Sequence, residues 1–162
     1  MKQSINILRQ TILNSKKIAL MLALLLTVGI SYSFASPNEE VNGDIKISFH
    51  KNFRDAQIMG SEVHNNITKL TFSMNNVVFF AFYSENGDLL AVTRNILSSQ
   101  LPVNLMVSLK NDYSGYWITE LFEFNGDGQN NYYVSLESAD SKLTLRSTDN
   151  KNWEVYGKTS KN

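Results

Sequence analysis

The sequence contains one long, mostly apolar stretch at residues 77–92, Val77-Val78-Phe79-Phe80-Ala81-Phe82-Tyr83-Ser84-Glu85-Asn86-Gly87-Asp88-Leu89-Leu90-Ala91-Val92. It consists of two apolar runs joined by a short polar turn. Asn86 and Gly87 tolerate the positive φ that a tight hairpin turn requires. The β-branched and aromatic residues on either side favour strands that pack on at least one face. The stretch therefore predicts a β-hairpin within a larger sheet.

Turn residues at hairpin spacing divide the rest of the chain into further strands, because Asn, Gly, Asp and Ser favour tight turns. The predicted strands are 57–63, 67–74, 77–83, 89–96, 116–124, 131–137, 142–147 and 153–157. They form two sets of four consecutive strands, which indicates antiparallel pairing rather than a parallel sheet with alternating helices.

Each set of four strands follows a short amphipathic segment. Apolar residues recur every four positions at Ile45, Phe49 and Phe53, which places them on one face of a helix. The same spacing recurs sixty residues later at Leu105 and Leu109. Matching apolar positions at one offset indicate an internal duplication, although short amphipathic helices also resemble one another by chance.

The predicted fold class is α+β. It consists of two tandem repeats, residues 44–97 and 98–158, and each repeat has one helix followed by a four-stranded antiparallel sheet. Together the repeats form a single domain at residues 44–158. We expect residues 36–43 to be a flexible leader in front of this domain.

Residues 1–35 have the three-part pattern of a secretory signal peptide. Four basic residues and no acidic ones accompany an apolar run at residues 18–30, and Ser33-Phe34-Ala35 supplies the small residues of a cleavage site. We expect cleavage after Ala35. An uncleaved membrane anchor is the alternative, but the run is shorter than the roughly 20 residues that cross a bilayer. The pattern predicts a periplasmic or secreted protein with no membrane attachment after cleavage.

Composition limits the partners of the exported chain. The full sequence has 15 basic and 15 acidic residues, and removal of the four bases in the signal leaves 11 bases against 15 acids. Nucleic acid and anionic membrane surfaces attract clustered Lys and Arg, so neither is an expected partner. The absence of cysteine excludes a lipid-modified cysteine, a disulfide and a thiolate metal site.

No residue pattern in the chain predicts catalysis. His50 and His64 have no carboxylate at a ligand-like spacing, and the chain contains no G-x-S-x-G turn. The loop at 123–130 lacks the distal Glu of a calcium-binding EF-hand. We therefore expect no enzyme activity, no metal and no cofactor. An enzyme whose catalytic cluster is assembled from distant residues is the least favoured class.

Alternation along the strand at 116–124 divides its large side chains between two faces. Tyr116, Ile118 and Phe122 match the buried positions, so Trp117 is predicted to point to the other face with Leu121. We expect an aromatic platform on the face of the sheet that carries no helix. Its predicted members are Trp117, Tyr133, Tyr83 and Phe79, with Arg94 and Arg146 as charged flanks.

Such a platform predicts a binding protein, because Trp and Tyr are frequent in interface hot spots. The expected partner is another exported protein, and inhibition of an exported enzyme is one specific version. The other interpretation of the aromatic residues is that they only cover the sheet. A carrier of a small ligand, with a pocket between the helices and the sheet, is the alternative function. An edge strand at each end of the sheet leaves a homodimer open.

The spacing of these features resembles a known group of proteins. The quoted features are Phe49-x3-Phe53-x2-Ala56-x-Ile58, the hairpin ending Tyr83-Ser84-Glu85-Asn86-Gly87-Asp88-Leu89-Leu90, Leu101-Pro102, and the helix end Tyr113-Ser114-Gly115. They resemble secreted PepSY-like proteins with the β-lactamase-inhibitor-protein-like (BLIP-like) fold, over nearly all of the chain after the signal. Many of these proteins carry Trp where this chain has Gly60. The resemblance implies a tandem repeat whose combined sheet grips or inhibits another protein, and it implies no catalytic residue.

Overall fold

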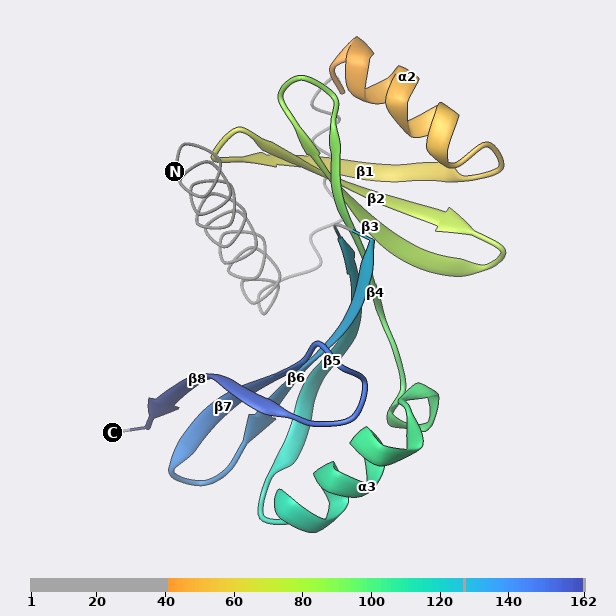
Figure 1. Cartoon of the computed structure of the whole chain (residues 1–162). Helices are drawn as coiled ribbons and strands as arrows, with labels where there is room; N and C mark the ends of the chain where they lie inside the picture. Colours follow the sequence, from red (N-terminus) through yellow and green to blue (C-terminus); the bar gives the residue numbers. More distant parts are fainter. Residues whose placement is uncertain (1–40, 127, 162) are drawn as a thin grey trace, which may run out of the picture. The chain divides into compact units, whose positions relative to one another are not determined.

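A computed structural model gives the structure of the chain (Figure 1). Asn38–Asn162 form one compact unit, in which the structure describes residues 41–126 and 128–161. The predicted signal peptide at 1–35 and the first part of the predicted leader lie outside the described residues. Within the described part of the chain, the fold is α+β, as the sequence predicts.

The elements follow one another in the predicted order. They are α2 (Gly43–Asn52), β1 (Gln57–His64), β2 (Ile67–Met74), β3 (Val77–Ser84), β4 (Leu89–Asn95), the short 3-10 helix η1 (Ser98–Gln100), α3 (Val103–Asp112), β5 (Trp117–Gly126), β6 (Gln129–Glu137), β7 (Ser141–Ser147) and β8 (Glu154–Ser160). The strand ends differ from the predicted ends by at most three residues.

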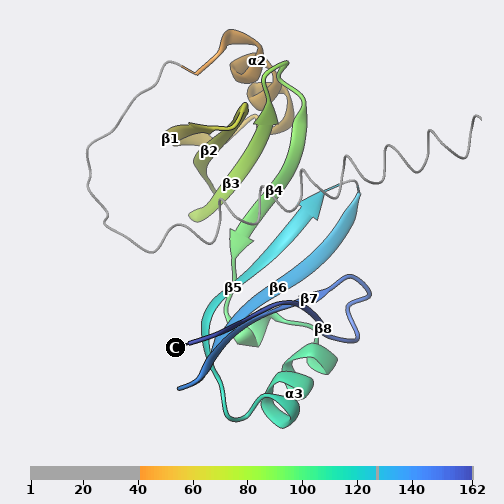
Figure 2. The same ribbon diagram turned by 90° about the vertical axis from the view of Figure 1, so that its left-hand side faces the viewer.

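The strands form a single antiparallel sheet. Its order is β1-β2-β3-β4-β5-β6-β7-β8, so each strand pairs with its neighbours in the sequence. β4 joins β5 through pairs that run from Val92 opposite Asn125 to Asn95 opposite Phe122 (Figure 2). The two predicted four-stranded sheets are therefore halves of one continuous eight-stranded sheet. The interpretation of these halves as a duplicated repeat remains a prediction.

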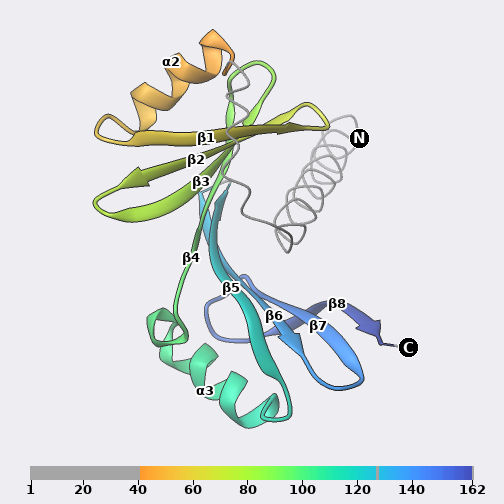
Figure 3. The ribbon, with the colours of Figure 1, turned by 180° about the vertical axis from the view of Figure 1, so that it is seen from behind.

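Both helices lie on the same side of this sheet (Figure 3). Val92 in β4 packs against the apolar cluster under α2, and Ile96, just after β4, belongs to the cluster under α3. Residues four apart in an extended chain point to the same face. We call the opposite side, which neither α2 nor α3 covers, the helix-free face.

Two apolar clusters attach the helices to the sheet. Under α2, Ile45 and Phe49 pack on Leu70, Phe72 and Tyr83, and the rings of Phe49 and Phe72 lie 5.1 Å apart, edge to face. Each of these side chains is almost completely buried, and such burial contributes roughly 1.5–3 kcal/mol per large apolar side chain. The helices are thus held by packing of the apolar face that the four-residue spacing predicted.

Under α3 the same arrangement is made with different residues. Leu105 and Leu109 pack on Val134, Leu136 and Leu145, all of which are buried.

The turns depend on residues that adopt positive φ. Asn65 and Asn66 join β1 to β2 with φ of 48° and 66°, and the pair Asn75-Asn76 joins β2 to β3 with 51° and 63°. Asn is one of the few residues other than Gly that enters this region readily. Gly87, at φ 80°, turns the chain between β3 and β4.

Gly87 also lets the hairpin approach the first turn of α2. A Cβ atom at this position would lie 3.0 Å from the carbonyl carbon of Asp44. The side-chain amide of Asn42, which caps α2, donates to the carbonyl oxygen of Glu85 at 3.4 Å. The turn between β3 and β4 therefore contacts the N-terminal end of α2 in addition to connecting the two strands.

Replacing Gly87 by Ala should cost more stability than the same change at Gly128. Both glycines have positive φ, but a Cβ at Gly128 meets nothing within 4 Å. We expect Gly128→Ala to lower the free energy of unfolding by about 1–2 kcal/mol through backbone strain alone. Gly87→Ala adds a clash with the helix backbone and should cost at least about 1 kcal/mol more. Urea unfolding of both variants measures the difference; equal costs would contradict the contact with α2.

Candidate functional site

The helix-free face carries a band of aromatic and charged side chains. The register places Lys69 opposite Phe82 and Thr71 opposite Phe80 in the first half, and Phe122 opposite Tyr133 in the second half. The full set with this orientation includes Glu62, Lys69, Phe80, Phe82, Thr93, Trp117, Phe122, Phe124, Tyr133, Glu137 and Arg146. Aromatic rings thus run across both halves of the sheet on the side that α2 and α3 do not cover.

Three places on this face combine an aromatic ring, a cation and a carboxylate. Lys69 lies 5.1 Å from the ring centroid of Phe80 and forms an ion pair with Glu62 at 3.4 Å. A cation over an aromatic ring is attracted by its negative face, and the adjacent carboxylate fixes the cation's position. The Lys69 group is thus held at one end of the helix-free face.

The other two groups lie in the second half of the sheet. Arg146 lies 5.3 Å from the ring centroid of Tyr156 and pairs with Glu154 at 3.2 Å. Lys161 lies 5.4 Å from the ring centroid of Trp117 and pairs with Glu137. The hydrogen bond from Lys161 holds the pKa of Glu137 below its ordinary value, which keeps this carboxylate charged.

Trp117 lies on the helix-free face, and 53% of its surface is exposed. The sequence predicted this orientation by placing Phe122 on the opposite face from Trp117. That assignment was wrong, because Phe122 lies on the same face as Trp117. A β-bulge between Ile118 and Glu120 adds one residue to β5, which exchanges the two faces for the rest of the strand. Leu121 consequently points to α3.

Tyr133 was expected in the exposed platform and is instead buried, with 1% of its surface exposed in the full chain. Its ring is stacked on Phe122 at 5.2 Å and 9°, and it meets Phe124 and Tyr156 edge to face. Burial raises the pKa of its hydroxyl. Tyr133 therefore supports the neighbouring rings on the helix-free face and is not available to a partner itself.

Tyr83 and Phe79 were expected on the same platform, and the structure places both on the opposite side. In β3, Phe79, Ala81 and Tyr83 face α2, while Phe80 and Phe82 face the helix-free side. Tyr83 is completely buried beside Phe49, and burial raises the pKa of its hydroxyl. The expected four-residue platform is thus not assembled.

The two predicted arginines also separate. Arg146 lies on the helix-free face beside Tyr156. Arg94 lies on the helix side, where its Nε donates to Glu123 Oε2 at 2.6 Å across the β4–β5 pairing. Of the six predicted residues, Trp117 and Arg146 remain candidates on the helix-free face.

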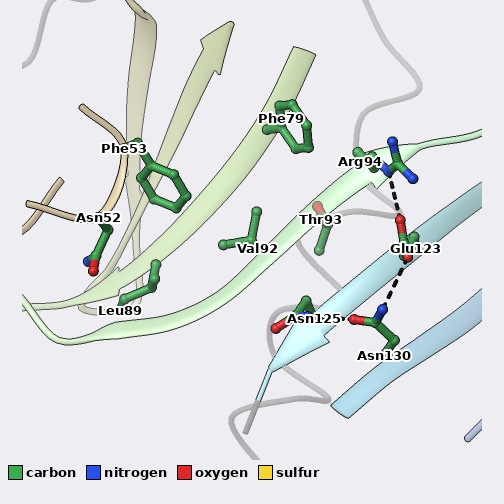
Figure 4. A pocket seen from close by; sticks show the side chains of 10 residues that line it. All are labelled: Asn52, Phe53, Phe79, Leu89, Val92, Thr93, Arg94, Glu123, Asn125 and Asn130. Carbon is green, nitrogen blue, oxygen red and sulfur yellow. Dashed lines mark hydrogen bonds and ion pairs between the residues drawn. The ribbon is translucent and has the colours of Figure 1, made fainter. Parts of the chain in front are cut away.

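A cleft lies on the helix side where α2 ends and the two halves of the sheet meet (Figure 4). Its volume is about 490 Å³. Its lining residues are Asn52, Phe53, Phe79, Leu89, Val92, Thr93, Arg94, Glu123, Asn125 and Asn130. Burial and the nearby carboxylate of Glu123 raise the pKa of Tyr132, which faces Glu123 on the next strand. The cleft brings together residues of helix α2 and of four strands, β3 to β6.

The sequence did not identify Tyr156, Lys161, Glu123 or Asn130 as site residues. Glu123 carried a signal, because a charged residue between two phenylalanines breaks an apolar strand. The other three lie in polar segments that carry no comparable signal.

The described residues contain no cluster of side chains typical of a metal site. No group of three or more His, Asp or Glu in residues 41–126 and 128–161 is placed to hold a metal ion. His50 and His64 are both exposed. In the same part of the chain, neither helix is long and apolar enough to span a membrane.

Several solved structures are similar to this chain. A DUF2874 family protein from Bacteroides uniformis has a TM-score of 0.64 and 13% sequence identity, and the match covers 74% of this chain and 88% of that one. A protein from Bacteroides eggerthii that is assumed to be periplasmic has a TM-score of 0.64 and 10% identity, with the same coverage. A BLIP-like protein from Bacteroides fragilis has a TM-score of 0.63 and 10% identity, over 74% of this chain and 85% of that one.

These similarities establish the fold. The chain has the BLIP-like fold that the sequence resemblance predicted. No family model matches the chain, and no curated protein matches it.

Replacement by Ala should lower the free energy of unfolding much more at the buried Tyr83 than at the half-exposed Trp117. Tyr83→Ala removes a completely buried ring and should lower the free energy of unfolding by about 3–5 kcal/mol. Trp117→Ala removes a half-exposed ring and should cost no more than about 1 kcal/mol. Thermal and urea unfolding measure both effects. A larger loss for Trp117→Ala would show that Trp117, and not Tyr83, belongs to the core.

Proposed function

We propose that this chain is an exported, non-catalytic protein that binds another exported protein through its helix-free face. One observation carries the proposal: within residues 41–126 and 128–161, both α2 and α3 lie on the same side of the sheet, and neither packs on the other side. An antiparallel sheet that faces water on one side commonly carries polar residues there. On this side of the sheet two aromatic rings are exposed, Trp117 at 53% and Tyr156 at 38%, whereas Phe82, Phe122, Phe124 and Tyr133 are buried.

The chemistry of the exposed groups supports a protein partner. Tyr, Trp and Arg are enriched in interface hot spots because they bury a large area with few rotatable bonds and retain a polar end. Trp117 is paired with Lys161, and Tyr156 with Arg146. These cations are already held by carboxylates, so less side-chain freedom is lost when a partner contacts them.

Two further features support export and the absence of catalysis. Residues 1–35 carry the signal-peptide pattern, and a structure with the same fold comes from a protein that is assumed to be periplasmic. Both histidines are exposed. The similar structures named above carry no enzyme name.

Inhibition of an exported enzyme is the specific version of this proposal. It is supported by the name of the Bacteroides fragilis neighbour, which likens that protein to a β-lactamase inhibitor protein. The partner of this chain would then lie across the strands of the helix-free face.

An internal duplication accounts for how the face is built. α2 and α3 begin at Gly43 and Val103 and have equal lengths. The bulge in β1 lies between Ile58 and Gly60, sixty residues before the bulge in β5. Repeating the same helix, bulge and strands places two equivalent surfaces side by side in one sheet, with the domain limits 44–158 that the sequence predicts.

An added charge at Trp117 should abolish partner capture. The protein from Ser36 onward is immobilised and exposed to a periplasmic extract of its source cells, beside the Trp117→Glu variant. We expect one protein retained by the wild type and a loss of about thirtyfold in the variant, as expected for a hot spot of about 2 kcal/mol. The variant should keep its unfolding temperature, because Trp117 is half-exposed. Quantitative mass spectrometry measures the retained protein.

Ile47→Glu is the matched control, because Ile47 is 71% exposed on α2, on the other side of the sheet. It should retain the partner as the wild type does. Loss of the partner in Ile47→Glu but not in Trp117→Glu would move the interface to the helix side and refute the proposal. Retention of a second copy of the chain would identify a homodimer as the complex.

A further inference from the structure

The cleft on the helix side lies where neither helix covers the sheet. α2 packs on the first half through Ile45 and Phe49, and α3 packs on the second half through Leu105 and Leu109. Between them, β4, β5 and β6 present polar residues on the side that is apolar elsewhere. The uncovered strip therefore forms the floor of a cleft instead of a part of the core.

One wall of the cleft is a connected polar chain from three strands. Arg94 Nε donates to one carboxylate oxygen of Glu123 at 2.6 Å, and Asn130 Nδ2 donates to the other at 3.4 Å. Asn125 Nδ2 donates to Asn130 Oδ1. The terminal nitrogens of Arg94 bond no other residue in the described part of the chain, and the side chain is 35% exposed. The wall therefore offers the terminal nitrogens of Arg94 as hydrogen-bond donors. Beside them, the carboxylate oxygens of Glu123 each accept one hydrogen bond and retain a further lone pair.

The opposite wall is apolar. Phe53 and Leu89 lie across the cleft from Glu123, and Phe79 lies on the strand next to that of Arg94 (Figure 4). Phe79 is stacked on Phe72 at 5.4 Å and 18°, so its ring is held in place from behind. A ring fixed in this way presents an apolar surface that loses little freedom when a ligand packs on it.

We propose that this cleft binds an uncharged saccharide. Arg94 and Glu123 neutralise each other, so the pair gives the cleft no net charge that would favour an ionic ligand. A wholly apolar ligand would strip water from three polar side chains without replacing their hydrogen bonds. A sugar ring has hydroxyls that donate and accept around an apolar C–H face, which matches both walls. A volume of about 490 Å³ lies in the usual range for small ligands.

This inference does not depend on the proposed protein interface. Arg94, Glu123 and Asn130 face the helix side, whereas Trp117 and Tyr156 are on the helix-free face. Loss of partner capture would leave saccharide binding untouched, and the reverse also holds. The two proposals can therefore fail separately.

Saturation-transfer NMR with the purified protein tests the inference directly. The probes are the methyl glycosides of glucose, galactose and mannose, N-acetylglucosamine and maltose, each at millimolar concentration, with glucuronate as the acidic comparison. We expect saturation transfer to at least one uncharged probe and a weaker signal for glucuronate. Asn130→Ala, at an exposed position, should weaken the best probe by about tenfold through loss of a hydrogen-bonding group.

Two glutamates provide a matched pair of variants. Glu123→Gln removes the carboxylate in the cleft, and Glu154→Gln removes the partner of Arg146 on the helix-free face. We expect the first to weaken the probe and the second to leave its affinity unchanged. The inference is overturned if no uncharged probe receives saturation, if glucuronate binds more tightly than all of them, or if Asn130→Ala and Glu123→Gln both bind as the wild type does.

Discussion

The pairing of β4 with β5 makes one sheet of the two halves of the fold. It involves few residues, from Val92 to Asn95, but it joins two halves that would otherwise each end in an open edge. The sheet continues across this pairing. Val92 packs under α2 and Ile96 packs under α3, and both point to the same face, so both helices lie on the same side of the sheet. The helix-free face and the cleft between the helices are both consequences of that arrangement. Arg94 and Glu123 form an ion pair across this pairing, which couples it to the cleft.

Local rules were sufficient to predict the elements of the fold. Asn65-Asn66 and Asn75-Asn76 adopt the positive φ that tight hairpins need, so the strand limits followed from the turn residues. The four-residue spacing of Ile45 and Phe49 predicted which face of α2 is buried. Antiparallel pairing between consecutive strands then required no long-range information. The BLIP-like fold could be inferred for the same reason, since its motifs are spacings of turns and apolar residues.

Side-chain orientation was predicted less well, because it depends on register between strands. The bulge between Ile118 and Glu120 leaves no clear mark in the sequence, yet it moves Phe122 to the other face. The assignment of Tyr83 to the helix-free face failed because α2 packs on the odd-numbered residues of β3, a choice made by tertiary contacts. The chain of contacts from Arg94 through Glu123 to Asn130 joins three strands and could not be derived from any one of them.

Site-specific photo-crosslinking in the source cells shows whether partners approach the helix-free face. A photoreactive residue replaces Tyr156 on that face in one strain and Ile47 on α2 in another, and both positions are exposed. We expect a covalent adduct of one defined mass from position 156 and none from position 47. An adduct from position 47 alone, or none from either, would contradict this expectation.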